Sequence, residues 1–221
     1  MVCCAFDNPV ICHRGLFESA FQKRRGEWRM LVTDLSDWND HINWSHLVDA
    51  GIGGVIVKIS EGRTLTELHG KHIAGAEARG LPWGVYCYTH AQTTERAREE
   101  ANRVLQALEA LGYGAPPLGI WFDVEAPEVI GHDRDDVTAI CSAFISTCNE
   151  DGYSAGIYAS LSTITDCLNL DDLADYVPVW IAQYASQCDF HDYFPDRILA
   201  GWQYTDSFVV DGNKYDLSEW Y

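Results

Sequence analysis

Basic residues are scarce in this chain. Its 221 residues include 15 Lys and Arg against 33 Asp and Glu, which gives a formal net charge of −18 at pH 7. The basic residues form a run only at Lys23–Arg25. Binding to nucleic acid depends on neutralising phosphates with Lys and Arg, so a chain this acidic would be repelled. We therefore predict a protein without a nucleic-acid partner.

Long apolar runs are also absent. No stretch approaches the roughly 18–20 apolar residues that span a bilayer, so we predict no membrane insertion. No secretory signal is present either, because the apolar run Val2–Phe6 ends at Asp7, short of the roughly 7–15 residues of a signal core. With 47% hydrophobic and 12% aromatic residues, the chain can nevertheless form a large folded interior.

Paired cysteine spacings are missing, although the chain has eight cysteines. Neither the CxxC spacing of a zinc site nor a catalytic cysteine signature occurs. Cys141 and Cys148 would lie about two turns apart on one helix, roughly 10 Å, which is too far for a disulfide bond. We expect free thiols in a reducing compartment, and the pairing of Cys167 with Cys188 stays open.

Methionine occurs only at Met1 and Met30. Residues 1–29 carry five Lys and Arg against three acidic residues, so they differ in charge from the acidic remainder. This segment has no amphipathic period. We predict that 1–29 is an extension, disordered or derived from a mis-assigned translation start, and that the catalytic domain covers 30–221. A short regulatory or tethering arm is the alternative.

Beyond this extension, short apolar runs alternate with helical stretches. The clearest helix is 94–111, where apolar residues recur at helical spacing and Thr94 could cap the start. A second helix is expected over 135–149, with Gly112 and Gly152 as helix stops. This alternation predicts an α/β fold with a mainly parallel sheet, closed into a barrel that loses its last helices. The expected strands are 30–34, 55–59, 83–88, 118–124, 154–158, 179–183, 201–205 and 214–217.

Acidic residues lie at the ends of several of these strands. Asp34 ends the first strand, and Asp216 lies in the last. Asp123 and Glu125 close the fourth strand, where a spacing of two points both side chains to one side, with Cα atoms roughly 6.5–7 Å apart. Two carboxylates on one face raise at least one pKa, a cost that suggests a use. Reactive groups of α/β barrels lie at the C-terminal strand ends.

Paired carboxyl groups suit the hydrolysis of a glycosidic bond. One carboxylic acid protonates the leaving oxygen, while a second carboxylate stabilises or traps the oxocarbenium centre. Side-chain reach could bring the carboxyls of Asp123 and Glu125 to roughly 5–6 Å, nearer the retaining geometry. Aromatic residues, on which the apolar faces of sugars pack, gather at the strand ends too. They are Trp38, Tyr86, Tyr88, Trp180, Trp202 and Tyr204.

Two other kinds of protein fit parts of this pattern. A non-catalytic glycan-binding barrel would keep the cleft, although it would not need an aligned pair of acids. A metal-dependent hydrolase could use His69 and His72, whose spacing places both on one helix face. No third ligand is readable, and His90 is the one histidine at an expected strand end. We therefore predict catalysis without a metal ion or another cofactor.

Eight motifs in order resemble those of the family 25 glycoside hydrolases, a family of lysozymes (N-acetylmuramidases) common among phage endolysins and bacterial autolysins. The resemblance runs from Leu31 to Tyr221. Its motifs are Asp34–Asn39, Val57–Gly62, Gly84–Tyr88, Phe122–Glu125, Gly156–Ser160, Trp180–Tyr184, Trp202–Tyr204 and Tyr215–Leu217. The departures are Asn39, where glutamine is more usual, and the run Tyr86–His90 in place of the commoner Tyr-His-Phe pattern.

The resemblance implies a single TIM-like barrel of five β/α units followed by three strands that lack most helices. It also implies cleavage of the β-1,4 bond between N-acetylmuramic acid and N-acetylglucosamine. Glu125 would be the general acid/base, and Asp123 would be the nucleophile or the group that orients the acetamido group of the substrate. Asp34 and Asp216 would complete a floor of four carboxyls. The residues implied to contact sugar are Tyr86, Tyr158, Trp180 and Gln203.

The resemblance further implies how the protein reaches its substrate. We expect a monomer whose partner is bacterial peptidoglycan. Because no signal sequence is present, a phage endolysin that stays cytoplasmic until a holin releases it to the cell wall is favoured over a bacterial autolysin. Lys58 and Glu61 match a recurrent motif, which we interpret first as a structural ion pair.

Overall fold

The computed structural model describes residues 21–24 and 27–221, with the backbone alone for 21–24, 27 and 28. Most of the predicted extension 1–29 therefore lies outside the described residues. Strand β1 (Phe21–Arg24) pairs antiparallel with the start of β2 (Glu27–Leu35). Strand β2 thus begins three residues before its expected start at Met30, whose side chain is fully buried.

Within the described residues, eight strands close into a barrel, which confirms the α/β barrel predicted from the sequence. Parallel pairings run from β2 through β3, β5, β6, β7 and β8 to β9, and antiparallel β10 closes the ring between β9 and β2. The other strands of the ring are β3 (Ile52–Glu61), β5 (Trp83–Tyr88), β6 (Ile120–Asp123), β7 (Ala155–Ser160), β8 (Val179–Ala182), β9 (Leu199–Val210) and β10 (Asn213–Trp220). The short β4 (Thr64–Leu65) pairs with the end of β3.

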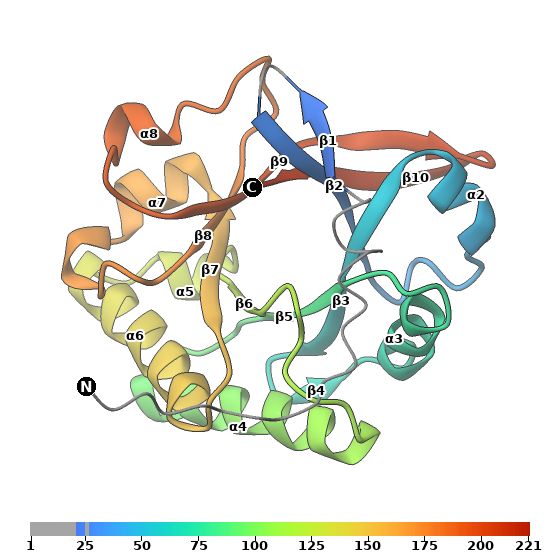
Figure 1. Ribbon diagram of the computed structural model, residues 1–221. Coiled ribbons are helices and arrows are strands. Elements are labelled where there is room, and N and C mark those ends of the chain that lie inside the picture. The colour runs from blue at the N-terminus through green and yellow to red at the C-terminus, as the bar shows by residue number, and fades with distance from the viewer. Residues whose placement is uncertain (1–20, 25–26) are drawn as a thin grey trace, which may run out of the picture.

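Helices lie around the outside of this ring (Figure 1). Helix α4 (Thr94–Leu111) has the predicted bounds, and α6 (Arg134–Glu150) extends one residue further at each end than predicted. Thr93, not Thr94, caps α4, because Thr93 has extended backbone angles and its Oγ1 accepts the N–H of Arg96 at 3.2 Å. The remaining helices are α2 (Trp44–Asp49), α3 (His69–Glu77), α5 (Pro127–Ile130), α7 (Leu161–Cys167), η1 (Leu170–Asp172) and α8 (Phe190–Tyr193). None of the helices in the described residues could span a membrane.

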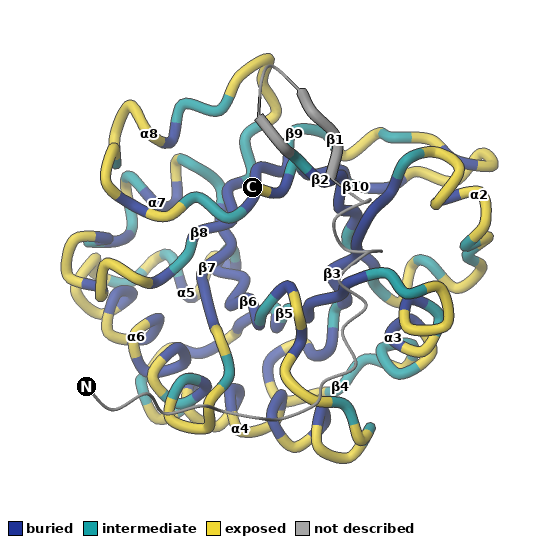
Figure 2. Tube along the Cα trace, in the orientation of Figure 1, coloured by how far each residue is buried: buried dark blue, intermediate teal, exposed yellow. Residues whose placement is uncertain are grey.

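Alternation along the strands divides the core into two layers. Outward side chains pack against helices, as where Phe122 of β6 stacks on Phe144 of α6 with ring centroids 4.2 Å apart. Gly156 makes room for the inward Trp121, since a Cβ at Gly156 would lie 2.6 Å from the indole. Figure 2 shows the ring of strands buried and the outer loops exposed. The inward side chains are Met30, Val32, Ile56, Leu118, Trp121, Tyr158, Trp180 and Trp220.

The inward direction of Trp121 determines where the acidic residues of β6 point. Trp121 packs edge-on against Trp180 and Trp220 inside the barrel, with ring centroids 6.0 and 5.3 Å away. Side chains two residues apart on a strand share a face, so Asp123 also points inward. The strand whose tryptophan fills the barrel therefore brings its carboxyl group to the C-terminal mouth.

Candidate active site

The four acidic residues predicted from the sequence meet at this mouth. Gln203 Nε2 donates to Asp34 Oδ2 at 3.0 Å and to Asp216 Oδ2 at 3.3 Å, although these two residues come from opposite ends of the barrel domain. Burial, then the charge of Asp216 and to a lesser extent that of Glu125, raises the pKa of Asp34. The charge of Glu125 likewise raises the pKa of Asp123, after the larger effect of burial. The four carboxyls therefore form one electrostatic cluster.

Asp216 reaches this cluster because β10 is irregular at that point. The register between β10 and β9 shifts between Tyr215 and Leu217, which places Asp216 at a β-bulge. A bulge turns a side chain away from the regular alternation of the strand. Thr33 Oγ1 donates to the backbone carbonyl of Asp216 at 2.7 Å and so fixes the bulge against β2.

Gln203 of β9 holds the cluster from below. Its Oε1 accepts hydrogen bonds from the hydroxyls of Tyr158, at 2.8 Å, and Tyr184, at 3.3 Å, while its Nε2 serves the two aspartates. The residue is only 1% exposed. Two hydroxyl donors on one side and two carboxylates on the other fix the orientation of the amide. Gln203, predicted to contact sugar, therefore lies beneath the cleft surface.

Asp123 and Glu125 differ in how far they are buried. Asp123 is 4% exposed, its Oδ1 is buried without a hydrogen-bond partner, and its pKa is raised well above the usual value, chiefly by burial. Glu125 keeps some solvent exposure, and its pKa is raised by burial and by the charge of Asp216. A carboxyl group with a raised pKa holds its proton to higher pH and can donate it.

Aromatic residues flank the four carboxyls at two depths. Tyr86 is half-buried beside them, and burial together with the charges of all four acids raises the pKa of its hydroxyl. Tyr158 is 8% exposed and bonds Gln203. Trp180 is 2% exposed and lies beneath Tyr158, with ring centroids 4.3 Å apart, while its Nε1 donates to Ser218 Oγ at 3.0 Å. Of the predicted sugar contacts, Tyr86 is thus the most open to the cleft.

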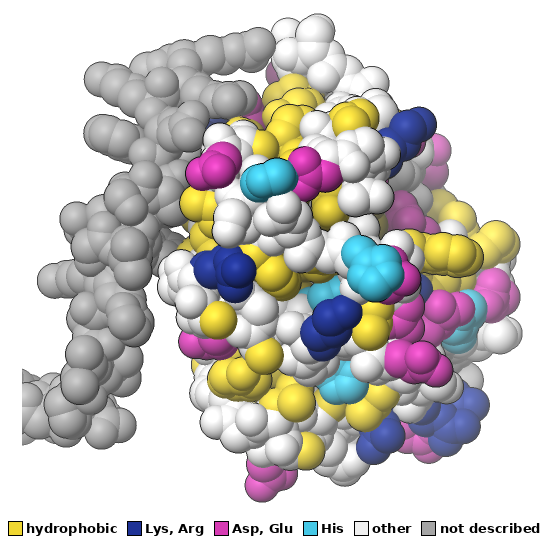
Figure 3. Space-filling view, turned by 90° about the vertical axis from the view of Figure 1, so that its right-hand side faces the viewer, with side chains coloured by type: hydrophobic (Ala, Val, Ile, Leu, Met, Phe, Trp, Pro, Cys, Tyr) yellow, Lys and Arg dark blue, Asp and Glu magenta, His cyan; other side chains and the backbone are white. Residues whose placement is uncertain are grey.

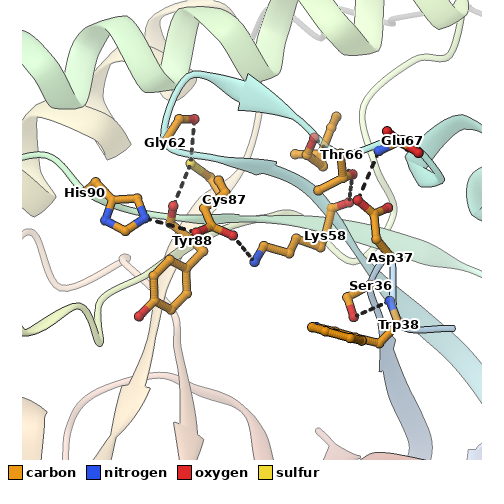
Figure 4. Close-up of polar contacts among 12 residues, drawn as sticks. Ser36, Asp37, Trp38, Lys58, Gly62, Thr66, Glu67, Cys87, Tyr88 and His90 are labelled. Carbon is orange, nitrogen blue, oxygen red and sulfur yellow. Dashed lines mark hydrogen bonds and ion pairs between the residues drawn. The ribbon is translucent and has the colours of Figure 1, made fainter.

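A polar network lines the rim beside the carboxyls (Figure 4). Lys58 Nζ binds Glu61 Oε2 at 2.9 Å, which confirms the predicted ion pair. Glu61 Oε1 lies 3.2 Å from His90 Nε2, and His90 Nδ1 lies 2.5 Å from Glu128 Oε1. The charge of Lys58 also lowers the pKa of Asp123, against the larger effect of burial. The network therefore connects the end of β3 with α5, the helix that follows Glu125.

Three residues at this site were not assigned to it from the sequence. Tyr184 lies in a motif of the resemblance but was not recognised as a partner of Gln203. His90 was noted at a strand end, and its two acidic partners come from segments 29 residues before and 38 residues after it. Glu128 had no signal beyond its position three residues after Glu125. Contacts across this range cannot be read from local spacing.

A hollow of about 520 Å³ lies on the outer side of the barrel between α2, α3 and the β9–β10 hairpin. Figure 3 shows this side, where basic, acidic and histidine side chains are interspersed. Trp44 in its wall lies directly on Gly75, and the guanidinium of Arg79 stands 5.9 Å from the Trp44 ring centroid. The ring of Trp44 therefore already packs against other residues of the protein.

His69 and His72, the residues considered as metal ligands from the sequence, lie on α3 and make structural hydrogen bonds. His72 Nε2 lies 2.9 Å from the carbonyl of Asn39, and His69 Nδ1 lies 2.6 Å from the carbonyl of Thr66. Each ring thus binds a backbone oxygen. The cysteines that the structure describes, including Cys167 and Cys188, are free thiols.

Comparisons with known proteins agree with this geometry. Residues 33–213 match the family model described as glycosyl hydrolases family 25. The modular autolysin LytC from Streptococcus pneumoniae has a TM-score of 0.77 and 23% identity, over 91% of this chain and 52% of that one. The CTP1L endolysin has a TM-score of 0.73 and 26% identity, over 86% and 66%. The catalytic domain of endolysin ply40, from bacteriophage P40 of Listeria monocytogenes, has a TM-score of 0.70 and 25% identity, over 87% and 93%.

The chain thus spans about half of the length of LytC and about two thirds of that of the CTP1L endolysin. No curated protein matches it. The family match covers Asp34, Asp123 and Glu125 and ends before Asp216. The resemblance predicted from eight motifs is therefore confirmed, and the chain belongs to family 25 of the glycosyl hydrolases.

Proposed function

We propose that this glycosyl hydrolase is a lysozyme, a 1,4-β-N-acetylmuramidase, that cleaves peptidoglycan between N-acetylmuramic acid and N-acetylglucosamine. The observation that carries the proposal is the convergence of four carboxyl groups at one mouth of the barrel. Related structures support a cell-wall substrate, since LytC is described in complex with a synthetic peptidoglycan ligand and two others are endolysins.

In the proposed reaction, Glu125 donates its proton to the glycosidic oxygen as the bond to the muramic acid C1 breaks. Its raised pKa supports this role, because the group must be protonated when the substrate binds. The same residue, now a carboxylate, takes a proton from the water that completes hydrolysis. Burial and the charge of Asp216 raise the pKa of Asp34 to about 8, so the Asp34–Asp216 pair supplies at most one negative charge near the oxocarbenium centre, which such a cation requires.

Asp123 has two possible parts in this reaction, as nucleophile or as the group that orients the acetamido group of the substrate. Its Oδ1 is buried and lacks a partner within the protein. A buried acceptor without a donor is costly unless a ligand supplies one. The N–H of an acetamido group is such a donor, so this observation favours the orienting role, in which the acetamido oxygen attacks C1.

Of the four residues predicted to contact sugar, one is exposed enough to do so, and the other three support the site from beneath its surface. We propose that Tyr86 contacts the sugar directly, because it is partly exposed beside the carboxyls. Tyr158 and Gln203 orient the acidic residues through their hydrogen bonds. Trp180, at 2% exposure, supports Tyr158 instead of contacting the ligand. We propose that these side chains and the four carboxyls carry out acid–base hydrolysis without a cofactor.

We also propose that the catalytic domain covers residues 30–221 and acts as a monomer. We propose further that the protein is an endolysin that is released from the cytoplasm to the cell wall with the help of a holin. Similarity to two endolysins supports this setting. We expect cells that express the protein to lyse only when a holin is co-expressed, and lysis without a holin would contradict this proposal.

The identity of the new chain ends tests the proposed bond. Purified peptidoglycan is digested, the products are reduced with borohydride, and the fragments are analysed by mass spectrometry. We expect reduced muramic acid at the new ends. Reduced glucosamine would instead indicate glucosaminidase chemistry. If the chain is a non-catalytic glycan-binding barrel, it sediments with peptidoglycan and produces no new ends.

The activity should depend on the protonation of Glu125. Burial and Asp216 raise the pKa of Glu125, so the proton donor is present below this raised pKa and is lost as pH rises through it. We therefore expect the rate of peptidoglycan cleavage to fall on the alkaline side. The measurement is the initial rate from about pH 4 to pH 9, and a flat profile to the alkaline end contradicts the assignment of Glu125.

A further inference from the structure

Trp38 is exposed to an extent that the fold does not explain. Its side chain is 95% exposed, the highest value among the large apolar side chains described. It follows Asp34 by four residues, so it stands on the turn that leaves β2 at the C-terminal mouth of the barrel. Tryptophan carries the largest apolar surface of any side chain, and here both faces of the ring are open to solvent.

The turn that carries Trp38 is firmly held. Ser36 N donates to Asn39 Oδ1 at 2.8 Å, and Asn39 N donates to the Ser36 carbonyl at 2.9 Å. The carboxylate of Asp37 accepts the N–H groups of Glu67 and Leu68, at 3.1 and 2.9 Å, just before α3. The backbone on both sides of Trp38 is thus fixed, which lowers the entropy lost when a ligand packs on the ring.

A hollow of about 420 Å³ adjoins this turn. Asp37, Glu61 and His90 are in its wall, with Thr64, Leu65 and Thr66. Lys58 pairs with Glu61 of this wall, and its charge lowers the pKa of Asp123, which links the hollow to the carboxyl cluster. Figure 4 shows Trp38 on one side of Lys58 and Tyr88 on the other. Carboxylate, imidazole and hydroxyl groups beside an open aromatic ring suit the hydroxyls and the apolar face of a sugar.

The charges around the hollow narrow the choice of sugar. Lys58 is neutralised by Glu61, and Glu128 and Asp37 add further negative charge. His90 lies between two glutamates and offsets part of this charge when protonated. In peptidoglycan the lactyl group of muramic acid carries a stem peptide with carboxylate groups, which this negative charge would repel, so a muramic acid residue fits poorly. The neutral N-acetylglucosamine ring fits.

We propose that Trp38 and the adjoining hollow form a further glycan subsite, in which the indole stacks on an N-acetylglucosamine ring of the strand bound at the four carboxyls. This inference rests on the proposed function, because it takes a peptidoglycan strand as the ligand. The subsite holds the strand and takes no part in breaking the bond.

The test separates binding from cleavage. Glu125→Gln and the double variant Glu125→Gln/Trp38→Ala are each sedimented with increasing amounts of purified peptidoglycan. We expect the double variant to need roughly three- to tenfold more peptidoglycan for half-maximal binding, as for the loss of one aromatic contact. Trp38→Phe should restore most of the binding. Free chitotetraose should compete less well with peptidoglycan for the Glu125→Gln/Trp38→Ala variant than for the Glu125→Gln variant.

Tyr176→Ala is the matched control, since Tyr176 is 66% exposed but precedes β8 at the opposite end of the barrel. Its binding curve should coincide with that of the Glu125→Gln parent. Identical curves for the parent and the Trp38→Ala variant overturn the subsite. So does a fall in melting temperature that accounts for weaker binding. If the wild type produces no new reducing ends, the proposed function fails, while the sedimentation curves still decide the role of Trp38.

Discussion

Replacement of Glu125 with glutamine is expected to reduce the rate of peptidoglycan cleavage by about 10²–10⁴-fold, the usual contribution of a general acid. Glutamine has the same shape but no proton of suitable acidity to give to the leaving oxygen. The change also removes a partly buried carboxyl whose pKa is raised by burial and by Asp216. The fold should therefore be retained, with a melting temperature at neutral pH equal to or above that of the wild type.

The measurement is the loss of turbidity of a peptidoglycan suspension, with circular dichroism to confirm the fold. Glu109→Gln is the matched control, because Glu109 is exposed on α4, away from the mouth of the barrel. We expect the control to clear the suspension at the rate of the wild type. Undiminished clearing by Glu125→Gln would remove this residue from the mechanism.

Replacement of Asp123 with asparagine is expected to have two opposite effects. Activity should fall by a factor comparable to that of Glu125→Gln, because an amide neither attacks C1 nor stabilises a positively charged acetamido group. The free energy of unfolding at neutral pH should rise by about 1–3 kcal/mol, because asparagine cannot ionise and so removes the cost of a buried carboxyl whose pKa is raised by burial. Asp123 is such a group, at 4% exposure and with an unpaired Oδ1.

The gain in stability should depend on pH in a defined direction. The pKa of Asp123 is higher in the folded protein than in the unfolded chain. Its contribution to stability is therefore full below the unfolded pKa and is lost as pH rises toward the folded pKa. The difference in unfolding free energy between Asp123→Asn and wild type should be small near pH 3 and should grow toward neutral pH. Urea unfolding at several pH values measures it.

Asp151→Asn is the control for this series, since Asp151 is exposed at the end of α6. We expect it to change neither activity nor the pH dependence of stability. A variant of Asp123 that is inactive and also less stable than wild type would mean that this carboxylate supports the fold. An active variant would mean that Glu125 works without it.

Much of the fold could be predicted because strands and helices differ in period. The apolar stripe of 94–111 fixed a helix that the structure places at the same residues. The alternation of side chains on β6 places Asp123 on the inward face of Trp121, as expected for a strand, whereas the strand ends at Asp123 and does not include Glu125. Such features are local, so a single sequence contains them.

Other features depend on contacts between distant segments. The strands of a parallel barrel are buried on both faces, so their sequence does not show that Trp180 lies beneath the cleft surface. The bulge at Asp216 needs a register between β9 and β10 that neither strand specifies alone. The start of β2 at Glu27 depends on its pairing with β1. Cap residues are similarly sensitive, since Thr93 and Thr94 are equally suited by type and only the backbone angles select Thr93.

The exposure of Trp38 also could not be predicted from the sequence, although here the structure shows a residue to be exposed where burial was the more usual expectation. From the sequence, an aromatic residue close to a strand end is more often buried than open. Trp38 is nearly fully exposed because it stands on a turn that the hydrogen bonds of Asn39 and Asp37 hold in place, and those contacts are known only from the structure. Trp38 was already among the aromatic residues expected at the strand ends, and the structure adds its exposure and the hollow beside its turn.

The release of reducing sugar from purified peptidoglycan tests the central claim most directly, namely that the carboxyl cluster breaks glycosidic bonds. Wild type, Glu125→Gln and Glu109→Gln are compared at mildly acidic pH, with equal protein concentrations. We predict that reducing ends accumulate with wild type and with Glu109→Gln and stay near background with Glu125→Gln. Equal release by all three proteins, or none by the wild type, would contradict it.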